Sequence, residues 1–297
     1  MGKIVIAGGT GFIGQALCDA FVQNQHSVRV LTRNPSRQSG GIDFIHWDPA
    51  DFSILPPLLD NIDCLINLVG HTVNCRHNKA GKEAIYSSRI QSVLTLGKAV
   101  NACQTPPQMW IQASSIGYYG NSGDRWCYEE SPAGNSFLSN VVLDWEAALE
   151  EFQLGKTCKL ILRIGVVLNE SGGFLEPLKK ITHYYMGAAA GSGRQYISWI
   201  HRTDVIQAIL WLFQRKQSGL FNLVAPNPVQ NRDLMKALRE HYHRPSIPNV
   251  PTPFVKLGAW LMKTSPELAL SGTRVSAEKL QSTGFQFNHP NISPNLL

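Results

Sequence analysis

The stretch KIVIAGGTGFIG, residues 3–14, sets the architecture expected of the whole chain, because it joins a strand pattern to a helix pattern through spaced glycines. Lys3–Ala7 is a short β-branched run, and apolar residues recur at helical spacing after the glycines. Gly8 permits a tight turn, Gly11 lets the backbone approach a ligand, and Gly14 lets the helix pack closely on the strand. The pattern is typical of a turn that holds a dinucleotide pyrophosphate at a helix N-terminus. The plainer alternative is a strand-to-helix turn without a ligand.

Strand-like and helix-like segments alternate through the first half of the chain. The strands are rich in β-branched or aliphatic residues, and the helices between them carry apolar residues at a helical period. The strands are expected at residues 3–7, 28–32, 43–46, 63–68, 109–114 and 159–168, and the helices at residues 12–24, 79–103, 137–152 and 203–213. Such alternation predicts βαβ units, and therefore an α/β fold with a Rossmann-type doubly wound parallel sheet.

The composition changes after the last apolar strand. Residues 171–198 are rich in glycine, and several prolines break the residues that follow into short pieces. We therefore expect a dinucleotide-binding Rossmann domain over residues 1–165 and a smaller substrate-side domain over residues 166–297. Residues near 199–223 are expected to return to the sheet.

Length and charge exclude several classes of protein. The chain has 297 residues, with 27 Lys and Arg against 21 Asp and Glu, so its net charge of +6 is a small excess. The basic residues neither form a run nor alternate with aromatics, so we expect no nucleic-acid partner. No apolar run approaches the roughly 18–20 residues that span a bilayer, and no signal peptide is evident, so we expect no membrane partner. Six cysteines without a CxxC pair indicate free thiols in a reducing, cytoplasmic setting.

The end of the second expected strand bears on the choice of dinucleotide. NAD-selective sites place Asp or Glu there to accept a hydrogen bond from the ribose 2′-hydroxyl. Here the strand ends in Thr32 and Arg33, with Arg37 nearby, and no carboxylate occupies the position. A guanidinium at this point pairs with a 2′-phosphate, which favours NADP(H) over NAD(H). The alternative is that Arg33 is a solvated loop residue.

Three motifs occur in the order expected of one enzyme family: GGTGFIG at residues 8–14, NLVG at 67–70 and SSIGYYG at 114–120. Together they resemble the extended short-chain dehydrogenase/reductases, the NAD(P)-dependent epimerase/dehydratase group. Further segments look like one atypical subfamily, whose bacterial members are called simply epimerase family proteins. These segments are residues 145–146, 163–168, 172–173, 191–195, 198–201 and 225–229. The resemblance covers nearly the whole chain.

The resemblance implies which residues contact the cofactor. Thr32 and Arg33 would meet the adenosine 2′-phosphate, and Arg89 and Val167 match cofactor-contact positions of the subfamily. The set implied is Gly8, Thr10, Gly11, Phe12, Ile13, Gly14, Thr32, Arg33, Leu68, Val69, Gly70, Arg89 and Val167. Residues 71–77 depart from the pattern of the relatives.

Ordinary members of that family carry a catalytic Tyr-x-x-x-Lys on the helix after the fifth strand. The tyrosine moves a proton to or from the substrate oxygen while hydride moves to or from the nicotinamide, and the lysine depresses the tyrosine pKa. Taking Glu146 as the glutamate that commonly follows this lysine puts Leu138 at the tyrosine position and Val142 at the lysine position. In this register the usual catalytic pair is absent.

Other groups after the fifth strand are candidates for the missing chemistry. Ser114 matches the family serine that binds the substrate oxygen, and Tyr118 and Tyr119 follow it at the expected mouth of the cofactor site. A tyrosine there could donate a proton if a positive charge lowered its pKa, with Arg89, His201 and the oxidised nicotinamide as candidate charges. The alternative is that both tyrosines pack without acid–base work.

The second half offers two candidate substrate contacts and one apolar helix. Arg194, with backbone N–H groups of the glycine loop at 191–195, suits an anionic substrate; the alternative is a flexible surface loop. His201 is a candidate pocket residue, and Asp204 is expected in the first turn of the helix that follows. Residues 254–262 have helical apolar spacing and are expected in the core or at the face of a homodimer. No metal site is expected.

Two functions remain open at this level. The first is an NADP(H)-dependent oxidoreductase or epimerase that acts on a small, anionic or nucleotide-linked substrate, and it follows from the glycine loop, Arg33 and the segment at Ser114. The second is a regulatory or interaction protein that binds the cofactor without catalysis, and it follows from Leu138 and Val142.

Overall fold

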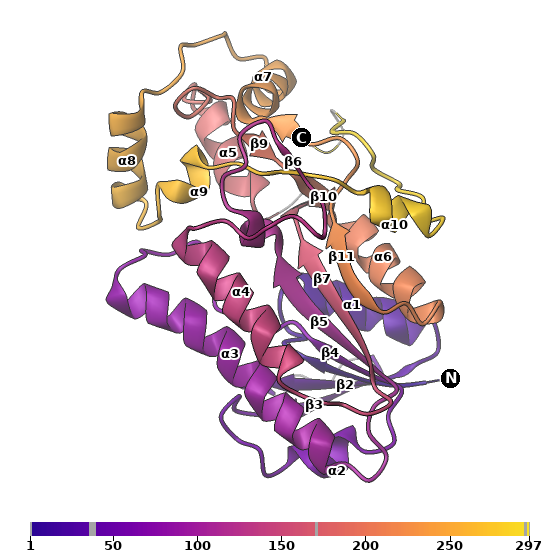
Figure 1. Ribbon diagram of the computed structural model, residues 1–297. Coiled ribbons are helices and arrows are strands. Elements are labelled where there is room, and N and C mark those ends of the chain that lie inside the picture. Colours follow the sequence, from indigo (N-terminus) through magenta and orange to yellow (C-terminus); the bar gives the residue numbers. More distant parts are fainter. Residues whose placement is uncertain (1, 36–39, 170–171, 294–295, 297) are drawn as a thin grey trace.

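The computed structural model describes residues 2–35, 40–169, 172–293 and 296, and at its centre lies a seven-stranded sheet (Figure 1). Across the sheet the order is β11 (Gly219–Leu223), β7 (Cys158–Ile164), β5 (Met109–Ser115), β4 (Cys64–Asn67), β1 (Lys3–Ala7), β2 (Ser27–Thr32) and β3 (Ile42–His46). Every neighbouring pair is parallel. The chain runs outward from β1 to β3 and then returns to the other side of β1 at β4. In open α/β sheets, ligands bind at the carboxyl ends of the strands beside such a reversal.

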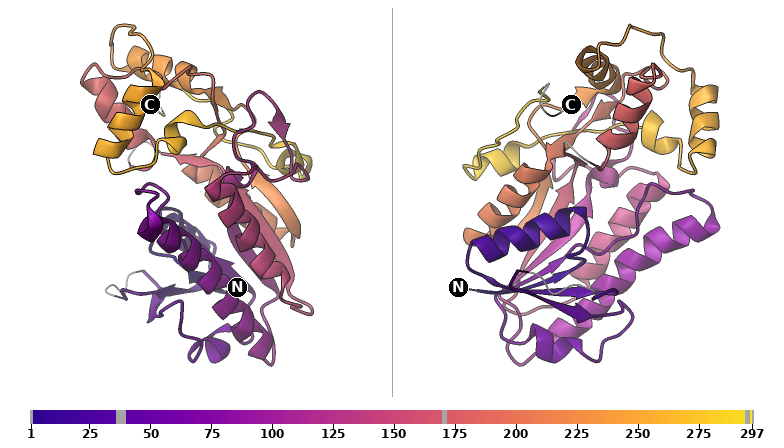
Figure 2. Two further views of the ribbon diagram at one scale, coloured as in Figure 1. Left: turned by 60° about the vertical axis from the view of Figure 1, so that its left-hand side comes forward. Right: turned by 180° about the vertical axis from the view of Figure 1, so that it is seen from behind.

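Helices cover both faces of this sheet. On one face, α1 (Phe12–Gln23) packs against α6 (Arg202–Gln214). On the other, α3 (Lys79–Ala102) packs against α4 (Phe137–Glu150) and α2 (Leu55–Leu59) (Figures 1 and 2). The Rossmann-type α/β fold expected from the sequence is thereby confirmed.

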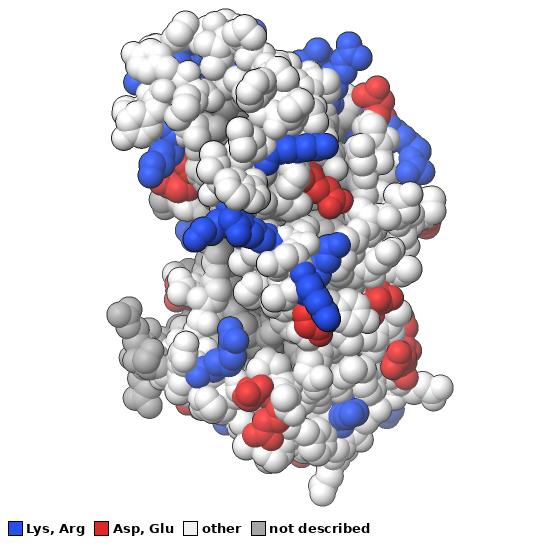
Figure 3. All heavy atoms as spheres, turned by 90° about the vertical axis from the view of Figure 1, so that its left-hand side faces the viewer, with Lys and Arg blue, Asp and Glu red and all other residues white. Residues whose placement is uncertain are grey.

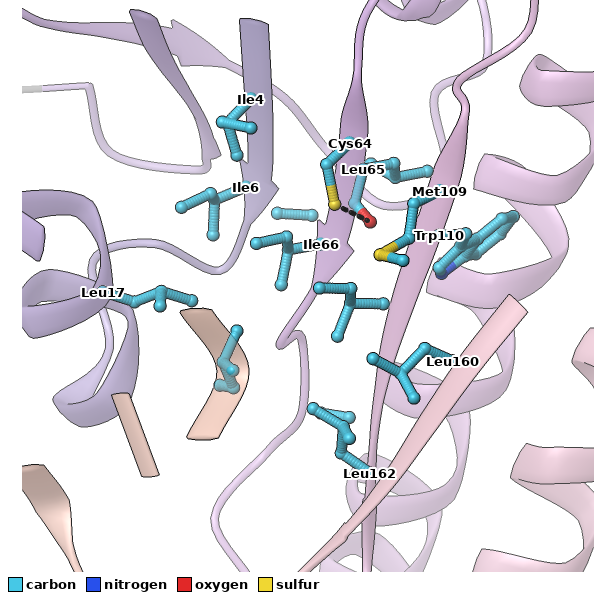
Figure 4. Close-up of a cluster of buried hydrophobic side chains, with 14 of the residues drawn as sticks. Ile4, Ile6, Leu17, Cys64, Leu65, Ile66, Met109, Trp110, Leu160 and Leu162 are labelled. Atoms are coloured by element: carbon cyan, nitrogen blue, oxygen red, sulfur yellow. Dashed lines mark hydrogen bonds between the residues drawn. The ribbon is translucent and has the colours of Figure 1, made fainter. Parts of the chain in front are cut away.

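The main core lies between the sheet and these helices. All four residues of β4 are buried, as are the last four of β1, which fits their continuously apolar sequences and a sheet covered on both faces. Figure 4 shows part of this cluster, with labels on Ile4, Ile6, Leu17, Cys64, Leu65, Ile66, Met109, Trp110, Leu160 and Leu162. The six cysteines are free thiols.

The remaining elements are short, and most lie beyond the carboxyl ends of the sheet strands (Figure 1). They are η1 (Ile116–Tyr119), β6 (Trp126–Cys127), β8 (Val166–Leu168), α5 (Leu175–His183), β9 (Tyr196–Ile197), β10 (Trp199–His201), β12 (Val229–Gln230), α7 (Asn231–His241), α8 (Thr252–Leu261), α9 (Glu267–Leu270), β13 (Arg274–Val275) and α10 (Glu278–Ser282). Two-stranded sheets join β8 with β10, β9 with β12, and β6 with β13.

One expected strand, residues 159–168, is two strands in the structure. The N–H of Gly165 donates to the Leu223 carbonyl, whereas the N–H of Val166 donates to the Ser198 carbonyl, so the chain changes partners between them. A Cβ on Gly165 would lie 2.7 Å from the Ser198 carbonyl oxygen, so a larger residue would force the two segments apart. This break lets β8 leave the main sheet and pair with β10.

The apolar residues 254–262 do not enter the core. Residues 254–261 lie in α8, and residue 262 follows the helix. Ala259 is the one buried residue of α8. The expectation of a core position is therefore wrong, while the homodimer face stays a prediction. In the described part of the chain, no helix is both long and apolar enough to cross a bilayer.

Gly14 offers a test of how closely α1 packs on the turn before it. A Cβ there would lie 2.6 Å from the Gly8 carbonyl oxygen and 2.7 Å from Gly9 Cα, and these backbone atoms cannot swing away. We expect Gly14→Ala to lower the free energy of unfolding by about 1–3 kcal/mol, the usual cost of overpacking, as measured by urea denaturation.

The matched control is Gly258→Ala in α8, where a new Cβ meets no atom within 4 Å. Alanine has the better helix propensity, so this control should stabilise the protein by up to about 1 kcal/mol. A Gly14→Ala variant as stable as the control would contradict the close packing.

Candidate functional site

The glycine turn stands at the carboxyl end of β1, beside the reversal of strand order. Gly8 has a φ of +81°, and its N–H donates to the Leu31 carbonyl at 3.2 Å. Gly11 is the N-cap of α1, and this described helix has no side-chain cap and no acidic residue in its first turn. A Cβ on Gly11 would come near only the Gly8 carbonyl oxygen, at 3.4 Å, so the approach is open. A helix N-terminus of this kind attracts an anionic group.

The end of β4 forms the next side of the site. A Cβ on Gly8 would lie 3.0 Å from the Leu68 carbonyl carbon and 3.1 Å from the Val69 nitrogen, so the two backbones are in close contact. Asn67 Oδ1 accepts the N–H of Val69 at 3.1 Å and fixes the turn after β4. Gly70 is exposed. The structure thus brings Leu68 and Val69 to the glycine turn, and Gly70 follows them.

Arg89 of α3 is a partly buried cation beside this turn. A Cβ on Gly70 would lie 3.2 Å from Arg89 Nη2. Arg89 Nη1 donates to the carbonyls of Ile85 and His71 at 2.9 and 3.1 Å, and its guanidinium carbon lies 5.1 Å from the centre of the Trp145 ring. Burial lowers the pKa of Arg89 to about 10. Among the described residues no carboxylate pairs with it, so an anion at this place would offset the cost of its desolvation.

The end of β2 lies next to the glycine turn, because Leu31 pairs with Ala7 across the sheet. Thr32 is buried, and its Oγ1 accepts the N–H of Asn34 at 3.3 Å. Arg33 is exposed and has no carboxylate partner in the described ranges. Arg37 lies outside the described residues.

Phe12 and Val167 meet on a further side of the turn. A Cβ on Gly173 would lie 3.4 Å from Phe12 Cζ and 3.5 Å from the Val167 carbonyl oxygen, so the start of α1 and the end of β8 come together. Arg202, at the start of α6, places its guanidinium carbon 5.0 Å from the centre of the half-exposed Phe12 ring. Ile13 turns toward the core cluster.

A buried ion pair joins the carboxyl ends of β5 and β7 to α4. Arg163 Nε and Nη2 donate to Glu146 Oε1 and Oε2 at 2.8 and 2.7 Å. Ser114, which pairs with Arg163 across the two strands, donates from Oγ to Glu146 Oε1 at 2.5 Å. The two charged side chains are only 4% and 12% exposed. Burial acts to lower the pKa of Arg163, but the hydrogen bonds and charge of Glu146 outweigh it and raise that pKa.

Tyr119 is part of the same buried network. Its hydroxyl accepts a hydrogen bond from Arg163 Nη1 at 3.0 Å and donates to Asn222 Oδ1 at 2.7 Å. Burial raises the pKa of Tyr119 to about 12, although Arg163 acts in the opposite direction. The expectation that Tyr119 stands at the mouth of the cofactor site is therefore wrong: its side chain is 1% exposed and its proton is held inside the protein.

Tyr118 differs from its neighbour. It is half-buried, and within the described chain its hydroxyl has no hydrogen-bond partner. The guanidinium carbon of Arg163 lies 3.4 Å from the centre of its ring. The positive charge beside the tyrosines is thus Arg163, which was not among the candidates from the sequence. The available signal was an arginine inside an otherwise apolar strand, because such a residue needs a buried partner.

The two positions of the missing catalytic pair lie on α4. Leu138 is the second residue of that helix and is partly buried, and its Cβ would be 3.9 Å from a Cβ on Gly117 of η1. Val142 is buried at 4% exposure. Both positions therefore contribute apolar packing.

Several backbone N–H groups of the glycine loop at 191–195 already donate hydrogen bonds within the protein. The N–H groups of Gly191 and Gly193 donate to backbone carbonyls at 2.9 and 3.0 Å, and that of Arg194 donates to Ser192 Oγ at 3.3 Å. These three N–H groups therefore already have acceptors, while the expectation that the loop binds an anion stays a prediction. The Arg194 side chain is exposed and has no ion pair among the described residues.

His201 is an internal cap rather than a pocket residue. It is 2% exposed, and its Nδ1 accepts the N–H of Thr203 at 3.3 Å at the start of α6. The carboxylate of Asp204, in the expected first turn, accepts the N–H groups of Asn288 and His289 at 2.9 Å each. Across the described ranges, no three His, Cys, Asp or Glu side chains gather as metal ligands.

Glu146→Gln tests the buried ion pair, because it removes the charge of the carboxylate and keeps its shape. Arg163 would then remain a buried cation without a counter-charge. We expect the free energy of unfolding to fall by about 3–5 kcal/mol in urea denaturation. The control is Glu150→Gln, which removes an ion pair to Lys159 whose carboxylate is 62% exposed, and which should cost at most about 1 kcal/mol. Similar losses in both variants would argue against a structural role for the pair.

Comparison with known proteins identifies two matching families. Residues 4–139 match the NAD dependent epimerase/dehydratase family, and residues 250–296 match a domain of unknown function, DUF1731. The chain is 34% identical over 296 residues to an epimerase family protein of Mycobacterium bovis, covering 99% of this chain and 96% of that one. It is 33% identical over 297 residues to an epimerase family protein of Staphylococcus aureus, with coverages of 98% and 97%.

Solved structures agree with these relatives. The crystal structure of human epimerase family protein SDR39U1 (isoform 2) with NADPH is similar at a TM-score of 0.85 and 26% identity, over 99% of this chain and 97% of that chain. A nucleoside-diphosphate sugar epimerase from Corynebacterium glutamicum is similar at a TM-score of 0.76 and 30% identity; the match spans 98% of this chain but 56% of that one. The chain therefore belongs to the epimerase family of proteins and has their nicotinamide-dinucleotide-binding Rossmann fold.

Proposed function

We propose that the chain is an NADP(H)-dependent oxidoreductase or epimerase that acts on a small anionic substrate. The observation that carries the proposal is the pair of cations at the carboxyl edge of the sheet, Arg33 and Arg89, which have no carboxylate partner in the described part of the chain. Arg33 follows β2, which pairs with β1, and Arg89 lies against Gly70 in the turn after β4, so with the uncapped N-terminus of α1 this edge suits a ligand with several negative charges. The NADPH in the structure of the human relative supports the same choice.

Different residues of this edge suit different groups of the cofactor. The N-terminus of α1 and the glycine turn suit the pyrophosphate, while Arg33, beside Thr32 at the end of β2, suits the 2′-phosphate. A carboxylate at the end of β2 would select NAD(H), and its absence supports NADP(H). When bound, this cofactor supplies hydride transfer at its nicotinamide ring.

Tyr118 is the group we propose for proton transfer. Its hydroxyl has no partner among the described residues, and the guanidinium of Arg163 lies against its ring. The guanidinium packs against the ring and holds it in place, and the hydroxyl is left to exchange a proton with a substrate oxygen. The Ser114 hydroxyl donates a hydrogen bond to Glu146, so it is not available as a donor to the substrate. We therefore assign Ser114 to orienting Glu146 and to accepting a hydrogen bond from the substrate.

The substrate side is proposed to be residues 166–297. The exposed and unpaired Arg194 is the candidate contact for an anionic substrate there. The free thiols favour a reducing cytoplasm.

A second function is favoured by the packing of α4. The positions of the missing pair are filled by Leu138 and the buried Val142, as expected of a protein that binds the cofactor for regulation or interaction without catalysis. One experiment separates the two: titration with NADPH and NADH, followed by absorbance at 340 nm with a panel of carbonyl and nucleotide-sugar substrates. Tight NADPH binding without turnover across a broad panel favours the regulatory function, and no binding of either cofactor overturns both.

Arg33→Ala tests the choice of cofactor. Loss of a charge-assisted contact to the 2′-phosphate should weaken NADPH binding by about 10- to 100-fold, and NADH binding by less than about twofold, in a fluorescence titration. The control is Arg29→Ala within β2, where the arginine pairs with Asp43 at 3.7 Å, and it should leave both affinities unchanged. An equal loss for the two cofactors would refute the 2′-phosphate assignment.

Tyr118→Phe tests the proton donor. On any substrate that the panel finds, kcat should fall by about 10²- to 10⁴-fold while NADPH affinity stays the same, because only the transferred proton is lost. Tyr119→Phe should instead lower the free energy of unfolding by about 1–3 kcal/mol, since it leaves Arg163 and Asn222 without an acceptor and a donor. Unchanged turnover in Tyr118→Phe would remove the tyrosine proposal.

A further inference from the structure

The helix α8 presents an apolar face that the described fold leaves uncovered. Phe254, Leu257 and Leu261 recur at spacings of three and four residues, so they lie along one side of the helix. These side chains are 63%, 55% and 65% exposed, and Trp260 and Met262 beside them are 62% and 61% exposed. We call these five residues the α8 face. So many large apolar side chains together in water mark a surface for binding something else.

The helix is held firmly at the edge of the molecule. It lies on the outer side of the upper part in Figure 1 and again in the right-hand view of Figure 2. Arg76 Nη2 donates to the Trp260 carbonyl at 3.4 Å, and Thr264 Oγ1 donates to Asn74 Oδ1 at 2.6 Å, so the loop after β4 fastens the end of α8. The face is thus displayed on a fixed support.

Between Glu240 and Glu267, the segment that contains α8 carries charges of one sign only. Residues 241–266 contain no Asp or Glu, and they include Arg244, Lys256 and Lys263. Lys256 and Lys263 are exposed, and neither pairs with a carboxylate in the described chain. Figure 3 views the molecule from this side: uncharged side chains cover much of its upper part, with several Lys and Arg side chains and fewer Asp and Glu side chains among them.

This combination of apolar and basic residues selects one occupant over others. A second copy bound through the α8 face would cover the apolar side chains but would leave Lys256 and Lys263 without a counter-charge, because the segment supplies no carboxylate. A bilayer with anionic headgroups matches both features, because the apolar side chains enter the headgroup boundary while the lysines meet the lipid phosphates. Tryptophan is also enriched at that boundary.

We propose that α8 docks the protein on the surface of an anionic lipid bilayer, lying in the plane of the headgroups. The expectation of no membrane partner rested on the lack of a membrane-spanning run and of a signal peptide. A helix that lies in the surface needs no spanning length, and its apolar face is exposed to solvent here. The proposal is independent of the cofactor chemistry.

Flotation of the full chain with vesicles tests the proposal. The protein should float with vesicles of phosphatidylcholine and phosphatidylglycerol at about 7:3, and at least about tenfold less with phosphatidylcholine alone. The triple variant Phe254→Ser, Leu257→Ser, Leu261→Ser should lose binding by more than about tenfold, because its apolar face is gone. The double variant Lys256→Glu, Lys263→Glu should lose binding to the anionic vesicles to a similar extent.

The matched control is Leu143→Ser, a leucine on α4 that is 44% exposed, which should float like the unchanged protein. Circular dichroism and thermal unfolding check that each variant is folded, and NADPH titration gives a second measure of native structure. The proposal is overturned if the unchanged protein does not float with anionic vesicles, or if the folded triple variant floats equally well. It is also overturned if sedimentation shows a dimer that the triple variant converts to monomers, since the α8 face would then join two copies of the chain.

Discussion

Arg163 carries a charge into an otherwise apolar strand, so its guanidinium must find acceptors inside the protein. It finds them in the Glu146 carboxylate, the Tyr119 hydroxyl and the Glu129 carbonyl. These partners belong to α4, to η1 and to the loop between them, which are the segments that follow β5. The Tyr119 hydroxyl in turn donates a hydrogen bond to Asn222 of the edge strand β11. One cation thus positions the segments that follow β5 in the chain.

The charged side chains at one end of the proposed cofactor site have no counter-charge in the described chain, whereas those at the other end are paired. At the end near β2 and α3, Arg33 and Arg89 have no carboxylate among the described residues, and burial depresses the pKa of Arg89, so binding an anion there relieves an existing cost. At the end near β5 and β7, the charges are already paired, and the hydroxyl of Tyr118 is the polar group that stays available. Such an arrangement favours strong dinucleotide binding and allows a narrow range of proton-transfer chemistry.

Local signals in the sequence account for most of the fold. Strand runs, helical periods and the glycine turn each depend on neighbours a few residues apart, and the structure has them in the expected places. The side-chain assignments that failed depend on distant partners: Tyr119 is held inside by Asn222, and the buried ring of His201 lies 3.8 Å from that of His289, centre to centre. Periodicity likewise gave α8 an apolar face but could not say what covers it.

The hydrogen bonds of the Asp204 carboxylate affect the order in which the contacts of the fold can form during synthesis. The carboxylate holds the backbone of Asn288 and His289, and the same helix, α6, packs on α1 behind the glycine turn. The edge strand β11 also follows α6 in the chain. A ribosome therefore has to release residues 288 and 289 before α6 is fully anchored, although β1 and the glycine turn emerge first. The buried Asp204 carboxylate therefore gains its two backbone partners only after most of the sheet has already been made.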